Sequence, residues 1–139
     1  MGMLQDGAEV SILARALQAR ASWFDEKHET AFRLFNGFLE GLPGLTVDVY
    51  ARTLLITDYT GGEDPAQGRV TTAADFYRQR LPWLRAVMVK TRGAVDSTAR
   101  RGVLISGDAP DRKILENGVW YAVDLSINLD SSLYLDTRL

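Results

Sequence analysis

Two adjacent segments with a two-residue alternation constrain the fold more than any other feature of this sequence. Apolar residues alternate with Thr, Asp and Tyr over residues 45–50, and a similar alternation follows over 53–57. Because this period places apolar side chains on one face of a sheet, the segments are predicted to be paired strands. Ala51 and Arg52 between them have the length of a tight hairpin turn; neither is the Gly or Asn that such turns prefer, so a bulge or longer loop is the alternative.

Helices and loops are predicted around these strands. Apolar residues at three- and four-residue steps predict an amphipathic helix over 9–24. A shorter helix is expected from Thr71 or Thr72 to about Leu81, before Pro82. Gly41-Leu42-Pro43-Gly44 is interpreted as a tight turn. Residues 61–68 and 94–101 are interpreted as exposed polar loops.

The other strand candidates lie on both sides of the second helix. They are the β-prone runs at 31–35, 85–91, 102–106, 113–116 and 119–125. Asn117-Gly118 is the strongest hairpin signal in the chain. The predicted class is therefore α+β, with an N-terminal helix followed by a mostly antiparallel sheet and a covering helix. Its order is strand-strand-helix-strand-strand plus a C-terminal hairpin.

Composition narrows the possible chemistry. The 139 residues suit one domain, and the absence of Cys excludes disulfides, cysteine metal sites and thiol nucleophiles. The single His28, in a charged stretch, is interpreted as a solvated surface residue. No Ser lies in a Gly-x-Ser-x-Gly elbow and no phosphate-binding Gly loop is present, so no catalytic residue is assigned.

Three acidic residues near the end of the chain and four aromatic residues are candidates for binding sites. Asp124, Asp130 and Asp136 recur at six-residue steps, but their spacing does not match a Ca²⁺ loop, and no metal site is predicted. Four aromatic residues could stack on bases, although aromatic residues in strands are more often core: Trp83, Trp120, Tyr121 and Tyr134. The apolar runs are too short to cross a membrane, and the start lacks a secretory signal, so a cytoplasmic location is expected.

Charge is unevenly distributed. The net charge is −2, yet residues 78–101 contain seven cations and one acid. That local charge of +6 leaves −8 for the rest of the chain. Thirteen of the 16 cations are Arg, which suits bidentate contacts with phosphate but also follows from a GC-rich genome.

Two motifs carry a resemblance to a known family. Residues 31–50, AFRLFNGFLEGLPGLTVDVY, resemble the segment around Arg-Leu-x-Asn-Gly and Asp-Gly-Leu-Pro-Gly-Leu-x-Val-Asp-x-Tyr. That segment is typical of the RlmI-like, S-adenosylmethionine-dependent methyltransferases of 23S ribosomal RNA that act on cytosine C5. Residues 116–125, ENGVWYAVDL, followed by LYLDTR at 133–138, are similar to a second family pattern in the same order.

The resemblance implies a substrate-facing domain of a larger methyltransferase. Residues 1–30 would be an N-terminal helix and linker, 31–126 the α+β domain, and 127–139 the lead-in to a Rossmann-type domain expected beyond Leu139. That domain would bind S-adenosylmethionine and carry catalysis, so the 139-residue chain alone is expected to hold no cofactor and to methylate nothing. In the family, Tyr134, Asp136 and Arg138 would form part of one edge of the cofactor pocket.

The partner that the resemblance implies is RNA, and ribosomal RNA in particular. Six cations are the candidate RNA contacts, and a solvated surface charge is the alternative for each: Arg33, Arg85, Lys90, Arg92, Arg100 and Arg101.

Two departures from the family leave other functions open. The family's N-terminal PUA domain has no counterpart here, and Ile127–Ser132 replace a Gly-Gln-Lys-Thr-Gly element. One alternative is a protein-interaction or homodimerisation module, because an apolar face that normally covers a catalytic domain would associate when exposed. The other is that the parent methyltransferase acts on a small molecule.

Overall fold

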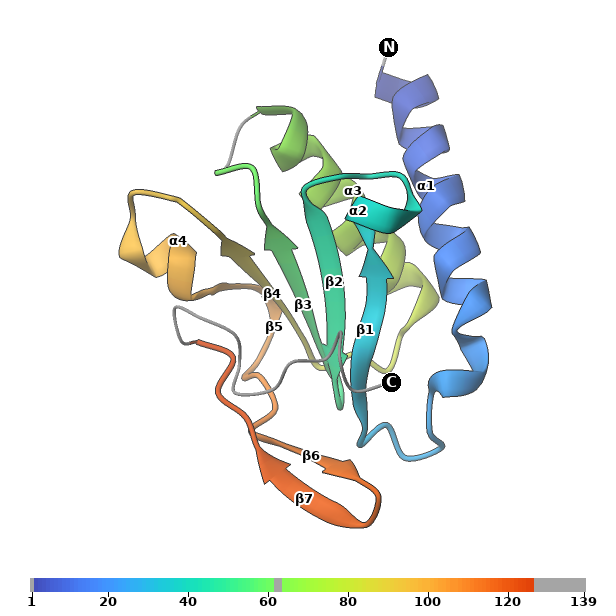
Figure 1. Ribbon diagram of the computed structural model, residues 1–139, viewed down its shortest axis with the longest axis vertical. Coiled ribbons are helices and arrows are strands. Elements are labelled where there is room, and N and C mark those ends of the chain that lie inside the picture. Colours follow the sequence, from blue (N-terminus) through green and yellow to red (C-terminus); the bar gives the residue numbers. More distant parts are fainter. Residues whose placement is uncertain (1, 62–63, 127–139) are drawn as a thin grey trace.

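The computed structural model describes residues 2–61 and 64–126, which form a five-stranded sheet, a two-stranded hairpin and several helices (Figure 1). The helices are α1 (Gly2–Ala19), the 3-10 turn η1 (Ala21–Trp23), α2 (Gly37–Glu40), α3 (Asp64–Arg80) and α4 (Ser97–Arg101). The strands are β1 (Ala31–Asn36), β2 (Leu45–Tyr50), β3 (Thr53–Asp58), β4 (Ala86–Thr91), β5 (Val103–Gly107), β6 (Lys113–Glu116) and β7 (Val119–Ala122). The α+β class and the mostly antiparallel sheet are confirmed.

The strand order of the sheet is the chain order, from β1 to β5. Only β3 and β4 pair in parallel, which requires the crossover that α3 supplies. The register places Asp58 opposite both Leu45 and Thr91, and Asn36 opposite Thr46. The ends of β1, β3 and β4 therefore share one edge, here called the C-terminal edge. The opposite edge, where β3 and β4 begin, is called the N-terminal edge.

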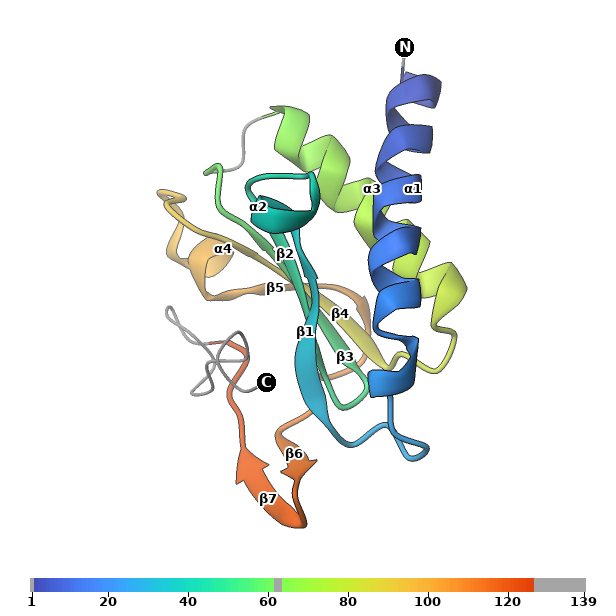
Figure 2. The ribbon, with the colours of Figure 1, turned by 45° about the vertical axis from the view of Figure 1, so that its right-hand side comes forward.

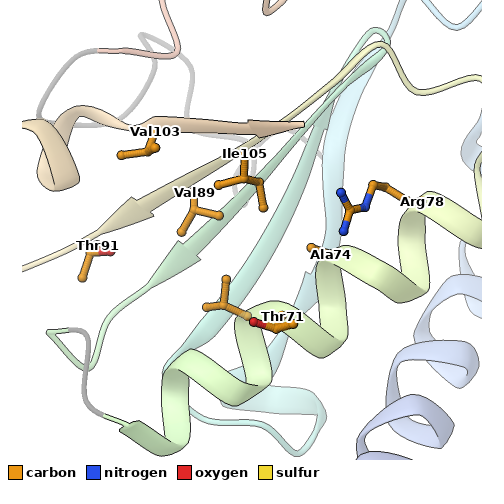
Figure 3. Close-up of a pocket in the computed structure, with 8 residues that line it drawn as sticks. Thr71, Ala74, Arg78, Val89, Thr91, Val103 and Ile105 are labelled. Carbon is orange, nitrogen blue, oxygen red and sulfur yellow. The ribbon is translucent and has the colours of Figure 1, made fainter. Parts of the chain in front are cut away.

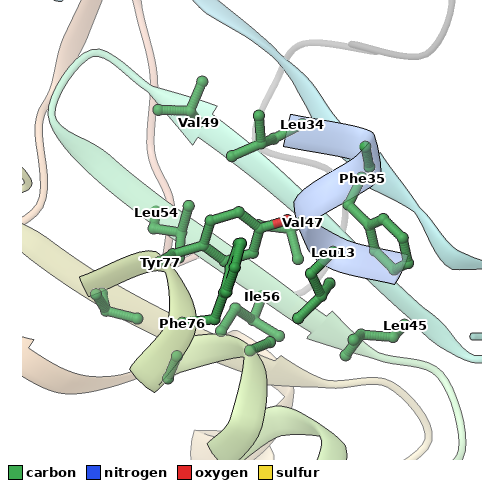
Figure 4. Close-up of a cluster of buried hydrophobic side chains, with 14 of the residues drawn as sticks. Leu13, Leu34, Phe35, Leu45, Val47, Val49, Leu54, Ile56, Phe76 and Tyr77 are labelled. Carbon is green, nitrogen blue, oxygen red and sulfur yellow. The ribbon is translucent and has the colours of Figure 1, made fainter. Parts of the chain in front are cut away.

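One face of the sheet is covered by α1 and α3, which lie side by side against it (Figure 2). The apolar positions of the alternation in β2 and β3 point to this face, and Val47, Leu54 and Ile56 are fully buried there. Leu13 from α1 and Tyr77 from α3 pack into the same cluster (Figure 4). This apolar layer holds the sheet rigid, so that its edges present loops in fixed positions.

The opposite face of the sheet carries a second, smaller cluster. Ile114, Val123 and Leu125 from the C-terminal part of the chain are buried against this face, in one cluster with Leu55 and Met88. Val123 N–H donates to the Arg112 carbonyl at 2.9 Å, which holds the two sides of the returning segment together. None of the helices in the described ranges combines the length and apolar character that crossing a membrane requires.

Both predicted hairpin turns are confirmed. Tyr50 pairs with Thr53, so Ala51 and Arg52 form a two-residue turn, and Ala51 takes a φ of +56° despite having a Cβ. Asn117 and Gly118 both have positive φ, as a primed turn requires.

Three sequence predictions are corrected by the structure. The loop predicted over 61–68 is helical from Asp64, because Pro65 is compatible with the first turn of a helix, where its missing N–H has no intrahelical acceptor. The loop predicted over 94–101 contains α4, which Asp96 caps by accepting from Thr98 N–H at 3.0 Å. The last strand ends at Ala122 rather than 125, because the chain turns back to bury Val123 against the sheet.

The predicted N-terminal helix is present with different bounds. It begins at Gly2 and ends at Ala19, and a separate 3-10 turn follows over Ala21–Trp23.

Candidate nucleic-acid interface at the C-terminal edge of the sheet

The connection between β1 and β2 is built by the first motif. The Asn36 side-chain oxygen accepts a hydrogen bond from Phe38 N–H at 3.2 Å and so begins α2. Gly37 is packed so closely that a Cβ there would overlap the backbone carbonyl oxygens of Leu42 and Leu45. The Asn-Gly pair is therefore required by the turn itself, and it points the Phe38 side chain outward from the sheet, where 55% of it is exposed.

Glu40 anchors this turn to α1. Its carboxylate accepts two hydrogen bonds from the Arg20 guanidinium, at 2.6 and 3.0 Å, and one from Asn36 N–H at 2.9 Å. Partial burial raises the pKa of Glu40, but the hydrogen bonds from Arg20 and Asn36 outweigh this effect and hold the pKa below its ordinary value of 4.5. The ionised carboxylate thus fixes the position of α2.

Asp58 organises the turn after β3. The side chain is fully buried, and its Oδ1 accepts from Thr60 N–H at 2.8 Å and from the Thr60 hydroxyl at 2.6 Å. Its backbone carbonyl accepts from Arg92 N–H at 2.8 Å, while Tyr59 N–H donates to the Gly44 carbonyl at 2.8 Å. The turn before β2, the end of β3 and the end of β4 are thereby joined around Tyr59.

These connections align three side chains from different parts of the chain. The rings of Phe38 and Tyr59 meet edge to face, with centroids 5.5 Å apart. The Arg92 guanidinium lies over the Tyr59 ring, 5.7 Å from its centroid. Phe38 and Tyr59 are 55% and 38% exposed, so the row Phe38–Tyr59–Arg92, here called the aromatic row, offers ring surface to solvent beside a half-buried guanidinium group.

The sequence reasoning missed Phe38 and Tyr59. Neither lies in a cationic stretch, and the strand order of the sheet had to be known before they could be placed beside Arg92. A local signal for an exposed apolar surface was the pair Phe38-Leu39, which lies between Asn36-Gly37 and the turn at residues 41–44. Leu39 is 83% exposed.

The six predicted cations are distributed over three places. Arg92, Arg100 and Arg101 lie at or beside the C-terminal edge, and Lys90, near the end of β4, is buried. Arg33 lies mid-strand in β1 and pairs with Asp48, at 2.8 Å from Nε to Oδ1. The exposed Arg85 lies at the N-terminal edge, 3.6 Å from Asp111. Arg100 and Arg101 therefore lie at the same edge as the aromatic row, to which Arg92 belongs, and Arg33 and Arg85 do not.

The cofactor and metal predictions rest on other residues. Tyr134, Asp136 and Arg138 lie outside the described residues. Over 2–61 and 64–126, no three acidic or His side chains cluster in a way that could hold a metal ion. Asp124 instead accepts from Ser126 N–H at 3.0 Å and from its hydroxyl at 2.7 Å, and these bonds lower the pKa of Asp124.

A groove of about 420 Å³ lies between α3 and the strands β4 and β5 (Figure 3). Its lining is mainly apolar, with Arg78 and two Thr side chains: Val70, Thr71, Ala74, Arg78, Val89, Thr91, Val103 and Ile105. β5 is an edge strand of the sheet, and its Val103, Leu104 and Ile105 are each about 40% exposed. This groove adds an apolar surface beside the charged C-terminal edge.

Two interpretations of single residues are corrected. Trp120 and Tyr121 are not core, since they are 47% and 39% exposed on the hairpin β6–β7, which projects from the sheet (Figure 1). His28 is not a simple solvated residue, because its ring stacks on Trp83 with centroids 3.8 Å apart. Trp83 also meets Phe24 edge to face, so its ring has two aromatic neighbours within the protein.

Two solved structures share this fold. A protein from Streptococcus mutans described as a SAM-dependent methyltransferase matches 96% of the chain with a TM-score of 0.76 and 24% identity. The crystal structure of SMU.776, described as a methyltransferase and complexed with SAH, matches 96% of the chain with a TM-score of 0.77. The chain covers 34% and 33% of these structures, and at this identity the likeness concerns the fold.

The sequence relatives are more specific. The Bacillus subtilis protein YwbD, named as a ribosomal RNA large subunit methyltransferase, is 33% identical over 93% of the chain. Ribosomal RNA large subunit methyltransferase I of Pseudoalteromonas atlantica is 30% identical over 91% of the chain. No protein-family model matches.

The chain is thus related to ribosomal RNA large subunit methyltransferases, which confirms the resemblance that the two motifs indicate. It spans about a third of the length of these relatives.

Proposed function

We propose that this chain is the RNA-recognition and substrate-positioning domain of an S-adenosylmethionine-dependent methyltransferase that acts on ribosomal RNA. Methyl transfer and cofactor binding would belong to a further domain of the parent protein, to which residues 127–139 lead. The α+β unit over 31–126 would hold the RNA, with the helix α1 of the N-terminal segment 1–30 packed against it. A ribosomal RNA substrate would place the protein in the cytoplasm.

One observation carries the proposal: the C-terminal edge gathers cations beside exposed aromatic rings. Arg92, Arg100 and Arg101 supply three positive charges there, while the acids Asp58, Glu40 and Asp96 each accept internal hydrogen bonds. Guanidinium groups suit phosphate oxygens and exposed rings suit bases, so the edge has both kinds of contact that RNA offers. The relatives named above act on ribosomal RNA according to their names, which favours RNA over other polyanions.

The salt dependence of RNA binding tests this proposal. Fluorescence anisotropy with a labelled single-stranded oligoribonucleotide of about ten nucleotides would measure the affinity of the chain over a series of salt concentrations. If Arg92 and Arg101 contact phosphates, R92A/R101A should reduce the slope of log K against log salt by about 1.4, at roughly 0.7 for each contact. R92A/R101A leaves Arg100 in place, because Arg100 donates to the Ala94 and Val95 carbonyls and supports its own loop.

A matched control removes the same charge elsewhere. Arg80, at the end of α3, and Arg85 are exposed and lie at the N-terminal edge. R80A/R85A should leave the slope within the error of the unaltered chain. Equal slopes for both double variants, or no RNA binding at low salt, would contradict the proposal.

The exposed strand β5 favours a second candidate function, a protein-interaction or homodimerisation module. Val103, Leu104 and Ile105 form a continuous apolar run on β5, the outermost strand of the sheet. An outermost strand pairs readily with a strand of another molecule. Light scattering distinguishes this function. A dimeric molar mass of the unaltered chain that falls to the monomer value in L104K would support it. A monomeric molar mass of the unaltered chain would contradict self-association.

A further inference from the structure

We infer that the aromatic row is a stacking site for an unpaired nucleobase, so that the C-terminal edge binds single-stranded or looped RNA in preference to a duplex. This inference rests on the proposed function and narrows it, because the cations alone would accept either form of RNA. It assigns a role to Phe38 and Tyr59, which neither packing nor the phosphate contacts require.

Phe38 is more exposed than packing of its ring would require. Phe is among the residues most often buried, yet this side chain is 55% exposed, and its ring meets Tyr59 edge to face. Because the two rings meet at an interplanar angle of 68°, the contact leaves ring surface of Phe38 open to solvent. A planar base could cover that surface without any change of the backbone.

Backbone hydrogen bonds fix the position of each residue of the aromatic row. Asn36 fixes Phe38 N–H, the Gly44 carbonyl fixes Tyr59 N–H, and the Asp58 carbonyl fixes Arg92 N–H. A preorganised ring loses little entropy on binding, so stacking contributes more affinity than it would on a mobile loop. The motif residues therefore act on RNA indirectly, as positioning residues for the aromatic row.

A positive charge lies next to the rings. The Arg92 guanidinium over Tyr59 places a cation within reach of the phosphate that follows a stacked base. Bases in a duplex are stacked on each other and expose no face to a protein ring, whereas loop and single-stranded bases do. The combination of an open ring and an adjacent guanidinium thus fits an unpaired nucleotide.

The test uses the 139-residue chain and an oligoribonucleotide that contains 2-aminopurine, whose fluorescence is quenched on stacking. The unaltered chain should quench the probe and should bind the single strand about tenfold more tightly than the same sequence in a duplex. F38L and Y59L should each weaken single-strand binding by about tenfold and reduce quenching, while Y59F should behave as the unaltered chain. W120L, which removes an exposed aromatic residue from the hairpin, is the matched control and should change neither value.

The outcomes separate this inference from the proposed function. If RNA binds with the salt slope expected for Arg92 and Arg101 but F38L and Y59L bind as the unaltered chain does, the stacking site is wrong and the RNA function stands. If no RNA binds, both fail. If F38L leaves RNA binding unchanged but abolishes self-association in light scattering, the aromatic row is a protein contact and the inference is overturned. Circular dichroism and thermal unfolding would establish that each variant is folded.

Discussion

The two edges of the sheet use the same kinds of residue in different ways. At the N-terminal edge, Arg85 lies beside Asp111, and Trp83 is stacked on His28 and touched by Phe24. At the C-terminal edge, Arg92 lies over the Tyr59 ring, and Tyr59 meets the exposed Phe38. The aromatic rings are thus packed against one another at one edge, whereas at the other edge Phe38 and Tyr59 keep exposed ring surface beside a guanidinium group.

This difference shows that residue type alone does not locate a binding surface. Arg85 and Arg92 flank the same strand and lie about 23 Å apart along it, at roughly 3.3 Å per residue, too far to bind one nucleotide. The neighbours that the fold brings to each end decide what each Arg can do. The variants below alter matched residues at the two edges, so that effects on stability can be separated from effects on RNA binding.

The largest loss of stability is expected from alanine substitution at two glycines that have no room for a Cβ atom. A Cβ at Gly37 would overlap the Leu42 and Leu45 carbonyls, and one at Gly107 would overlap the Arg85 carbonyl. G37A and G107A should each lower the free energy of unfolding by about 3 kcal/mol in urea titrations. Only G37A, at the C-terminal edge, should also weaken RNA binding by the folded protein. Equal losses of RNA affinity would break the distinction between the edges.

A smaller loss of stability is expected from removing the two aspartate side chains that hold the turns at either end of β3. Asp58 accepts two hydrogen bonds from Thr60, and Asp111 accepts one from Arg52 N–H at 3.0 Å and one from the Thr53 hydroxyl at 2.7 Å. D58A and D111A should each cost about 2 kcal/mol of unfolding free energy. D58A should in addition weaken RNA binding, since the turn that carries Tyr59 loses both hydrogen bonds from Thr60, and D111A should not. Thermal unfolding and anisotropy measure the two quantities separately.

The ion pairs Arg20–Glu40 and Arg85–Asp111 should contribute less to stability than these turns, and the two contributions should differ. E40Q breaks the partly buried pair with Arg20 and should lower the free energy of unfolding by about 1 kcal/mol at pH 7. Because the folded-state pKa of Glu40 is lowered, the difference from the unaltered chain should be complete above pH 4.5 and should vanish as the pH falls through the folded-state pKa. R85A, at the exposed pair with Asp111, should change stability by less than about 0.5 kcal/mol. A pH-independent E40Q effect would contradict the role of the ionised carboxylate.

The smallest effect is expected under α3, away from both edges. The Tyr77 hydroxyl is buried and has no hydrogen-bond partner within the described residues, and burial raises the pKa of Tyr77. Y77F removes an unsatisfied polar atom, so it should leave the protein as stable as before or stabilise it by up to about 1 kcal/mol. RNA binding should be unchanged. A clear loss of stability in chemical denaturation would show that the hydroxyl has a partner.

Local patterns predicted the sheet but not the site. The alternation over 45–57 and the Asn117-Gly118 turn act over a few residues, so the paired strands and the hairpin could be predicted from the sequence. The helical start at Asp64 was missed because Pro65 and Gly68 suggest a loop, although Pro is compatible with a first helical turn. The aromatic row needs the order of all strands from β1 to β4, which no local pattern contains.

The most direct test of the account is to map the RNA contact on the protein. An NMR titration of the isotope-labelled chain with the single-stranded oligoribonucleotide would follow every assigned backbone amide. The account predicts that the largest shift changes occur at Phe38, Tyr59, Arg92 and Arg101, with the amides of Arg85 and Asp111 unmoved. Shifts concentrated at the N-terminal edge, or spread evenly over both edges, would contradict it.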